Sequence, residues 1–126
     1  MSKILIVDDD PVMHLLYRGV LEKAGYQFAS ASTAQGLLPI CEKEKPDLVL
    51  MDVMMPGFDG ISALRDLRKR EATKNVTVVV ITANVSEHAT FRREAEAAGA
   101  MGFLTKPFSP QQLLAEVQKH LPLGDS

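Results

Sequence analysis

The sequence predicts an α/β protein with a doubly wound sheet of parallel strands, and three features support this prediction. Continuous apolar runs at 4–7 (ILIV), 48–51 (LVLM) and 78–81 (VVVI) are typical of central strands that are covered on both faces. Segments with helical spacing of apolar residues separate these runs. Strand and helix alternate five times along the 126 residues, which favours βαβ units with right-handed crossovers.

The individual strands are predicted from short apolar, β-branched or aromatic segments. The expected strands are Lys3–Asp8, Gln27–Ala31, Leu48–Asp52, Thr77–Thr82 and Met101–Thr105. The expected helices are Pro11–Ala24, Thr33–Lys45, Ile61–Arg70, Ser86–Ala98 and Gln111–Leu121. Asp10 and Gly25 are suited to the two ends of the first helix, whereas Gly36 and Pro39 weaken the second.

Composition limits the classes of function. With 46% hydrophobic residues the chain can bury a real core, and we expect a single domain over 1–126 with its core from about 3 to 121. The net charge of −2 disfavours direct binding of nucleic acid or of an anionic membrane. The single cysteine, Cys41, excludes an internal disulfide and is expected to be a small buried residue. Neither a signal peptide nor a run of ~20 apolar residues is found, so a cytoplasmic location is expected.

Polar side chains stand at the carboxyl ends of the predicted strands, where ligands bind in sheets of this kind. These are the acids 8–10, then Asp52, Thr82 and Lys106. Carboxylates that converge at ~5 Å repel each other by about 3 kcal/mol per pair at an effective dielectric near 20. Clustered oxygens of this type suit a hard divalent cation such as Mg²⁺, which is often shared with phosphate. The pattern therefore predicts a cation site, with Lys106 as a further positive charge beside it.

Four motifs resemble the successive signatures of the response-regulator receiver domain of two-component systems. They are VDDD at 7–10, LVLMDVMMPGFDG at 48–60, VITAN at 80–84 and GFLTKPF at 102–108. The resemblance extends in order from Lys3 to about Leu121. It implies a flavodoxin-like (βα)5 fold with five parallel strands in the order 2-1-3-4-5.

The resemblance also implies a role for each acid. Asp52 would be the phosphoacceptor. Asp9 would bind Mg²⁺ directly, and Asp8 would act mainly through a water. The backbone carbonyl of Met54 would complete the protein's share of the metal ligands, together with Asp52. Asp10 has no fixed role in the family and is interpreted as a helix cap.

Three further positions carry family roles by the same resemblance. Thr82 and Lys106 would each bind a phosphoryl oxygen, and Phe103 would be the aromatic switch residue. The peptide bond between Lys106 and Pro107 would be cis. Thr82 would move toward the phosphoryl group while Phe103 turns inward, which would repack the face formed by the fourth helix, the fifth strand and the fifth helix.

The implied partner is a histidine kinase or a phosphotransfer protein, which presents a phosphohistidine to Asp52. The domain would assist its own phosphorylation and dephosphorylation without being a turnover enzyme. A dimer that forms on phosphorylation is a further expectation, and the downstream partner is not specified. Leu15 lies off the apolar face of the first helix, beside His14 and Arg18. It is interpreted either as a singly exposed leucine or as part of a surface that docks the kinase.

Two other classes of function were weighed. A phosphatase of the haloacid-dehalogenase type needs a second aspartate two residues after the nucleophile, where this chain has Met54. A receiver-like module that is never phosphorylated is disfavoured by the complete acceptor set. Whether the chain acts as a stand-alone regulator or within a longer regulator or hybrid kinase stays open.

Several remaining side chains are expected to have simple surface roles. His14, His88 and His120 are expected on solvated helix surfaces, and the basic run 65–74 on a solvated face near a helix end.

In this fold the side chains two residues after the acceptor and two after the threonine flank the approach of a hydrolytic water. Here they are Met54 and Asn84, neither of which is suited to activate that water, so slow loss of the phosphoryl group is predicted.

Overall fold

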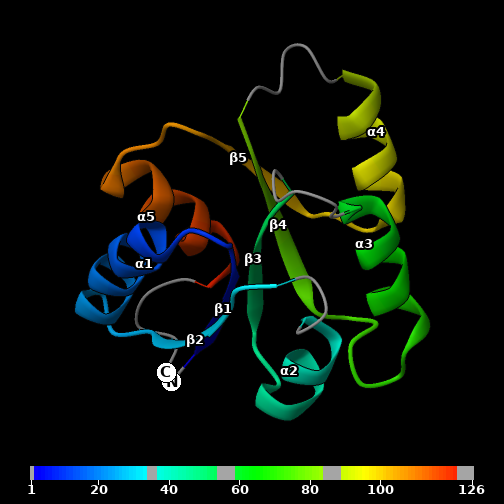
Figure 1. Ribbon diagram of the computed structural model, residues 1–126, viewed down its shortest axis with the longest axis horizontal. Helices are drawn as coiled ribbons and strands as arrows, with labels where there is room; N and C mark the ends of the chain where they lie inside the picture. The colour runs from blue at the N-terminus through cyan, green and yellow to red at the C-terminus, as the bar shows by residue number, and fades with distance from the viewer. Residues whose placement is uncertain (1, 34–36, 54–58, 84–88, 122–126) are drawn as a thin grey trace.

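The computed structural model describes residues 2–33, 37–53, 59–83 and 89–121. Over these residues strands and helices alternate along the whole chain (Figure 1). The strands are β1 (Lys3–Val7), β2 (Gln27–Ala31), β3 (Leu48–Asp52), β4 (Thr77–Thr82) and β5 (Gly102–Thr105). The helices are α1 (Pro11–Lys23), α2 (Leu37–Glu44), α3 (Gly60–Lys69), α4 (Ala89–Ala98) and α5 (Pro110–His120). In the part of the chain so described, no helix combines the length and apolar character needed to cross a membrane.

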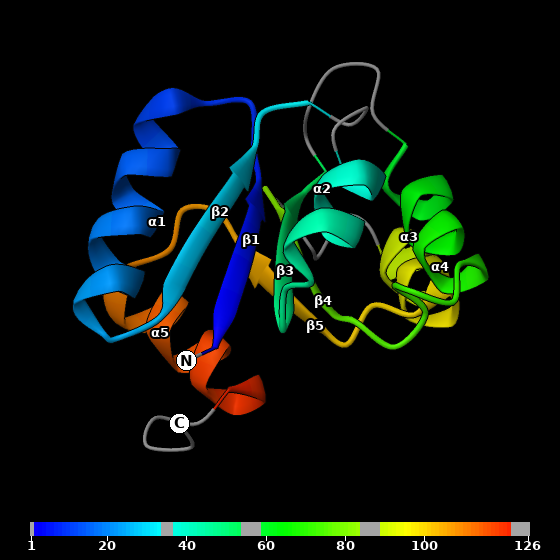
Figure 2. The same ribbon diagram turned by 90° about the horizontal axis from the view of Figure 1, so that it is seen from below.

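The strands form one sheet in the order β2-β1-β3-β4-β5, and each neighbouring pair is parallel. This is the order predicted from the sequence. Helices α1 and α5 cover one face of the sheet, and α2, α3 and α4 cover the other (Figures 1 and 2). The chain changes face between β1 and β3, so the carboxyl ends of these two adjacent strands border the switch point of the sheet.

The three central strands are buried on both faces, as their continuous apolar runs predicted. Residues 4–7, 48–51 and 78–81 all have 0% exposed surface. Alternate side chains enter two separate cores, because successive residues of a strand point to opposite faces. Leu5 and Val7 pack into the core under α2, α3 and α4, whereas Ile4 and Ile6 pack into the core under α1 and α5.

Most element boundaries agree with the predictions to within one or two residues, and the exceptions have local causes. β1 ends at Val7 rather than Asp8, although the Asp8 N–H still donates to the Ala31 carbonyl at 3.1 Å. The second helix does not include Thr33 and is described from Leu37. Pro39 is its third residue, a position whose N–H needs no partner within the helix. The predicted start of the fourth helix lies outside the described residues.

Capping residues define the ends of several helices. The Asp10 side chain accepts from the Val12 N–H at 2.9 Å and caps α1, as predicted. Asp59 caps α3 by accepting from two backbone N–H groups at 3.1 Å. Ser109 forms a capping box at the start of α5. Gly25, with φ of +98°, ends α1 in a conformation that favours glycine.

The expectation of a fully solvated basic run at 65–74 is wrong for Arg68. Its guanidinium donates to the carbonyls of Lys74 at 3.1 Å, Val76 at 2.7 Å and Gly99 at 2.6 Å. A Cβ at Gly99 would collide with the Arg68 side chain, so the glycine allows this close approach. Arg68 thereby ties the end of α3 to the segment before β4 and to the turn after α4, a role that residue spacing does not show.

Candidate functional site

The three predicted acids meet at the carboxyl ends of two adjacent strands. Asp8 and Asp9 follow β1, and Asp52 is the last residue of β3. One ligand oxygen from each residue lies within 4.8 Å of the other two. Asp8 and Asp52 are buried, with 0% and 3% exposed surface, whereas Asp9 is exposed. The cluster is therefore open to solvent on the side of Asp9.

Backbone hydrogen bonds beyond the strand ends hold this edge of the sheet in register. The Val53 N–H donates to the Ile81 carbonyl at 3.1 Å, directly after Asp52. The Lys106 N–H donates to the Thr82 carbonyl at 2.8 Å. These bonds connect the ends of β3, β4 and β5, so the polar side chains that follow the three strands share one rigid support.

Lys106 joins the carboxylates from the opposite side of the cluster. Its Nζ donates to Asp52 Oδ2 at 2.8 Å and to Asp8 Oδ2 at 3.3 Å. The peptide bond from Lys106 to Pro107 is cis, as predicted. Partial burial opposes the charge of Lys106, but the hydrogen bond and charge of Asp52, followed by those of Asp8, outweigh it and raise the pKa of this ammonium. Lys106 is therefore a permanent cation at neutral pH.

The Asp8 carboxylate has further donors from helix α1. Asp8 Oδ1 accepts from the Asp10 N–H at 2.9 Å, and Asp8 Oδ2 accepts from the Tyr17 hydroxyl at 3.2 Å. Burial, followed by the charge and hydrogen bond of Asp8, raises the pKa of Tyr17 above its ordinary value. The hydroxyl therefore stays protonated and can donate.

The sequence predicts a helix over Pro11–Ala24 but does not predict the contact of Tyr17 with Asp8. The type of residue could have indicated this contact, whereas its position in the helix could not. A tyrosine on a buried helix face needs a partner for its hydroxyl. The nearest predicted polar cluster, at the end of β1, supplies that partner.

His14 is partly buried, so the solvated surface predicted for it is wrong in part, and its place in the docking group stays a prediction. Its Nε2 faces the Asp8 carbonyl oxygen, and its ring meets Phe28 edge-on with centroids 6.5 Å apart. Leu15 is 71% exposed, and Arg18 is exposed and pairs with Glu22. Leu15 and Arg18 therefore remain available at the surface, whereas the His14 ring turns toward the backbone of Asp8.

The other two histidines were also predicted to lie on solvated helix surfaces. His120 is partly buried and lies 3.2 Å from Glu116 Oε2 on the same helix, so the solvated interpretation is wrong for it as well. His88 lies outside the described residues. Met54 and Asn84 do so too, and their predicted roles therefore stay predictions.

Thr82 lies on β4 and Phe103 on β5, the two strands that follow β3 in the order of the sheet. Thr82 ends β4 with 3% exposed surface and pairs with Thr105 across the sheet. Phe103 is partly buried on β5, and the Arg92 guanidinium lies 4.8 Å from its ring centroid. The predicted hydroxyl and aromatic ring are thus connected to the acidic cluster through adjacent strands.

The donor set of this site fits a divalent cation. Asp8, Asp9 and Asp52 offer carboxylate oxygens, which are hard ligands, from three side chains at one place.

Residues 4–118 match the response regulator receiver domain. The chain belongs to this family. Its function is that of a phosphoacceptor in two-component signalling.

Curated relatives support the assignment over nearly the whole receiver. Protein PilH of Pseudomonas aeruginosa is 37% identical over 93% of this chain and 95% of its own length. Sporulation initiation phosphotransferase F of Bacillus subtilis is 38% identical over 97% of this chain and 95% of its own length.

Solved structures share the receiver fold. Chemotaxis protein CheY4 of Vibrio cholerae has a TM-score of 0.88 at 29% identity, over 95% of this chain and 98% of CheY4. The receiver domain of a sensor histidine kinase from Pseudomonas aeruginosa has a TM-score of 0.83 at 29% identity, over 95% and 97% of the two chains. That second structure contains a magnesium ion coordinated in its active site cleft.

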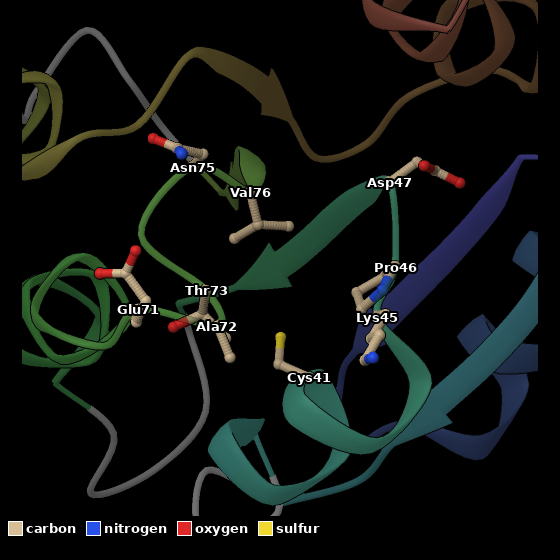
Figure 3. A pocket seen from close by; sticks show the side chains of 9 residues that line it. All are labelled: Cys41, Lys45, Pro46, Asp47, Glu71, Ala72, Thr73, Asn75 and Val76. Atoms are coloured by element: carbon tan, nitrogen blue, oxygen red, sulfur yellow. The ribbon is translucent and has the colours of Figure 1, made fainter.

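A cavity of about 340 Å³ lies at the other end of the receiver sheet, before β3 and β4 (Figure 3). Its lining residues are Cys41, Lys45, Pro46, Asp47, Glu71, Ala72, Thr73, Asn75 and Val76. The Cys41 thiol points into this space (Figure 3). Burial, followed by the charge of Glu42, raises the pKa of Cys41 to about 11, so the buried thiol is protonated at neutral pH. The cavity is separate from the acidic cluster, and Cys41 is the small buried residue that the sequence predicted.

Proposed function

We propose that Asp52 of this receiver accepts a phosphoryl group from the phosphohistidine of a histidine kinase or a phosphotransfer protein. The observation that carries the proposal is the position of Lys106, whose ammonium lies between Asp52 and Asp8 within a cluster of three carboxylates. A fixed cation beside a buried carboxylate can pair with the phosphoryl group that joins that carboxylate. The shared edge of the sheet supports all four side chains.

The chemistry follows from these positions. An Asp52 carboxylate oxygen attacks phosphorus in line, the new O–P bond forms, and the P–N bond to the donor histidine breaks. The product is an aspartyl phosphate, and the electron pair of the broken bond returns to the imidazole. Lys106 would turn from Asp52 to a phosphoryl oxygen, and the Thr82 hydroxyl would donate to another. Water would later cleave the acyl phosphate.

We further propose Mg²⁺ as the cation of this site. Asp9 would bind it directly, as the exposed member of the cluster, and Asp8 would act mainly through a water. Asp52 and the backbone carbonyl of Met54 would supply the remaining protein ligands. When bound, Mg²⁺ neutralises negative charge on the phosphoryl oxygens. The three carboxylates of the cluster and the magnesium ion in the kinase receiver structure support this choice.

Signalling would proceed through the α4–β5–α5 face. Movement of Thr82 toward the phosphoryl group would vacate space at the end of β4, and Phe103 would turn inward. The Phe103 ring now lies against the Arg92 guanidinium, so its inward rotation would break that contact and alter the surface of α4. A partner that reads this face would therefore distinguish the two states.

Other parts of the functional assignment also remain proposals. The domain would assist its own phosphorylation and dephosphorylation without turning over a free substrate. Leu15 and Arg18, both exposed on α1, would contact the helices of the phosphohistidine donor, together with the partly buried His14. A dimer on phosphorylation, an output through a downstream partner and a cytoplasmic location are proposed on the same family grounds.

The central experiment measures the intact mass after incubation with acetyl phosphate and Mg²⁺. The wild-type protein should gain one phosphoryl group, and hydroxylamine should remove it, as expected for an acyl phosphate. Asp52→Asn should gain none, whereas Asp10→Asn, which retains a helix-capping oxygen, should be labelled normally. Undiminished labelling of Asp52→Asn would place the acceptor elsewhere. Rapid multiple turnover of p-nitrophenyl phosphate would instead support a phosphatase.

A further inference from the structure

The Asp8 carboxylate is held by three donors that come from different places in the chain. The Asp10 N–H donates to Oδ1 at 2.9 Å, while Tyr17 and Lys106 both donate to Oδ2, at 3.2 Å and 3.3 Å. The Asp8 side chain is only 1% exposed. A buried carboxylate depends on such donors, since water cannot replace them.

The two donors to Asp8 Oδ2 differ in how firmly they are fixed. Lys106 divides its ammonium between Asp8 and Asp52, and its side chain is 25% exposed. Under the proposed function it turns toward a phosphoryl group, which weakens its hold on Asp8. Tyr17 cannot turn away in this manner, because its side chain is fully buried in the core under α1 and α5. Its ring also stacks on Phe108, with centroids 6.0 Å apart and planes inclined by 27°.

We propose that Tyr17 is a positioning residue for the cation site. Its hydroxyl holds the Asp8 carboxylate in place when Lys106 turns to the phosphoryl group, so that Asp8 keeps one orientation before and after phosphoryl transfer. Tyr17 acts through Asp8 and does not itself touch the reacting atoms. This inference rests on the proposed function, because it assumes that Asp8 takes part in cation binding.

The first test measures binding of Mg²⁺ alone by calorimetry, in the wild type and in Tyr17→Phe. The phenylalanine keeps the ring and its contact with Phe108 but removes the donor. The dissociation constant for Mg²⁺ should rise by about three- to tenfold, the size expected for losing one hydrogen bond to a carboxylate that must stay oriented. Tyr26→Phe is the matched control, because its hydroxyl contacts the Leu121 carbonyl instead. It should bind Mg²⁺ as the wild type does.

A second test asks whether Tyr17 becomes more important when Lys106 no longer holds Asp8. The Tyr17→Phe substitution should weaken Mg²⁺ binding by a larger factor in a Lys106→Ala background than in the wild type. If Tyr17→Phe weakens Mg²⁺ binding by the same factor in both backgrounds, the two donors act independently on Asp8, which would contradict the proposal.

The rate of phosphorylation by acetyl phosphate gives an independent measure. In Tyr17→Phe the Mg²⁺ concentration for half-maximal rate should rise, while the rate at saturating Mg²⁺ stays within about twofold of wild type.

The outcomes separate this inference from the function on which it rests. A wild-type protein that does not bind Mg²⁺ would overturn the metal assignment and the role of Tyr17 together. Wild-type binding with an unchanged affinity in Tyr17→Phe would overturn only the role of Tyr17. Tighter binding in that variant would also overturn it, since the hydroxyl would then compete with the cation for Asp8.

Discussion

The ammonium of Lys106 lies 2.8 Å from Asp52 Oδ2 and 3.3 Å from Asp8 Oδ2, although 98 residues separate Lys106 from Asp8. Both carboxylates are buried, so this one cation offsets much of their mutual repulsion. Asp9 adds a third negative charge to the same cluster. The balance of charge at the site therefore depends on Lys106 in the absence of a divalent cation.

Replacing Lys106 should reveal this dependence. Lys106→Met removes the charge, keeps much of the apolar stem, and should lower the free energy of unfolding by about 1–2 kcal/mol without Mg²⁺. This is less than for a fully buried pair, because the Lys106 side chain is 25% exposed. Mg²⁺ should raise the melting temperature of the variant by more than that of the wild type. Thermal unfolding with and without Mg²⁺ measures both effects, and equal shifts in the two proteins would contradict the argument.

The Arg68 clamp should contribute to stability rather than to phosphorylation. Arg68→Ala leaves the carbonyls of Val76 and Gly99 without their guanidinium donor, which should cost about 2–3 kcal/mol in urea unfolding. Arg68→Lys should recover only part of the loss, because one ammonium cannot reproduce the planar fork. Lys69→Ala, at an exposed site on the same helix, is the control and should change stability little. A neutral effect of Arg68→Ala would show that solvent satisfies these carbonyls equally well.

The cap of α3 should give a pH-dependent contribution to stability. Hydrogen bonds from the Ser62 backbone and side chain, and then from the Ile61 backbone, hold the pKa of Asp59 below its ordinary value. The folded state therefore binds this proton less tightly than the unfolded state, so the contribution is present above the ordinary pKa and is lost as pH falls through the lowered value. Asp59→Asn should destabilise the protein at pH 6 and progressively less toward pH 3, as measured by urea midpoints.

Ser62→Ala provides a graded control for that experiment. It removes the hydroxyl that donates to Asp59 Oδ2 at 2.9 Å but leaves the backbone donors. The pH dependence should shrink without disappearing. A difference between wild type and Asp59→Asn that stays constant from pH 6 to pH 3 would exclude the charge of Asp59 as its source.

Cys41 should react slowly with thiol reagents in the folded protein. Its pKa is raised to about 11, so only about 0.1% of the thiol is ionised at pH 8, and its side chain is also buried. Alkylation at pH 8 should therefore be at least about 100-fold slower than in urea, and its rate in the native state should climb as pH approaches 11. Native and unfolded rates that agree at pH 8 would contradict both the burial and the raised pKa.

The lifetime of the phosphoryl group is predicted from sequence, since Met54 and Asn84 lie outside the described residues. Neither side chain is suited to activate a water, so the aspartyl phosphate should persist well beyond the seconds timescale. The double variant Met54→Asn with Asn84→Glu should shorten it, as followed by loss of the phosphoryl mass in Mg²⁺. A double variant that decays no faster than wild type would show that these side chains do not control hydrolysis.

The sheet and most of its boundaries follow from local patterns in the sequence. Runs such as 48–51 are apolar at every position, and only a strand covered on both faces buries all of them. The predicted cap Asp10 acts through a neighbour two residues away, so local chemistry is enough to place the start of α1. The acids at the ends of β1 and β3 were predictable for a related reason, since parallel strands bring their carboxyl ends to one edge.

The contacts that side chains from different helices make at that edge depend on how the elements pack together. Tyr17 and His14 are three residues apart on α1, and the spacing alone does not show that both turn toward Asp8. That outcome depends on how α1 rotates as it packs on β1 and α5, which is set by the whole core. Arg68 reaches Gly99 for the same reason, because the contact requires α3 and α4 to pack side by side. Residue type determined which groups need partners, and packing determined which partners they found.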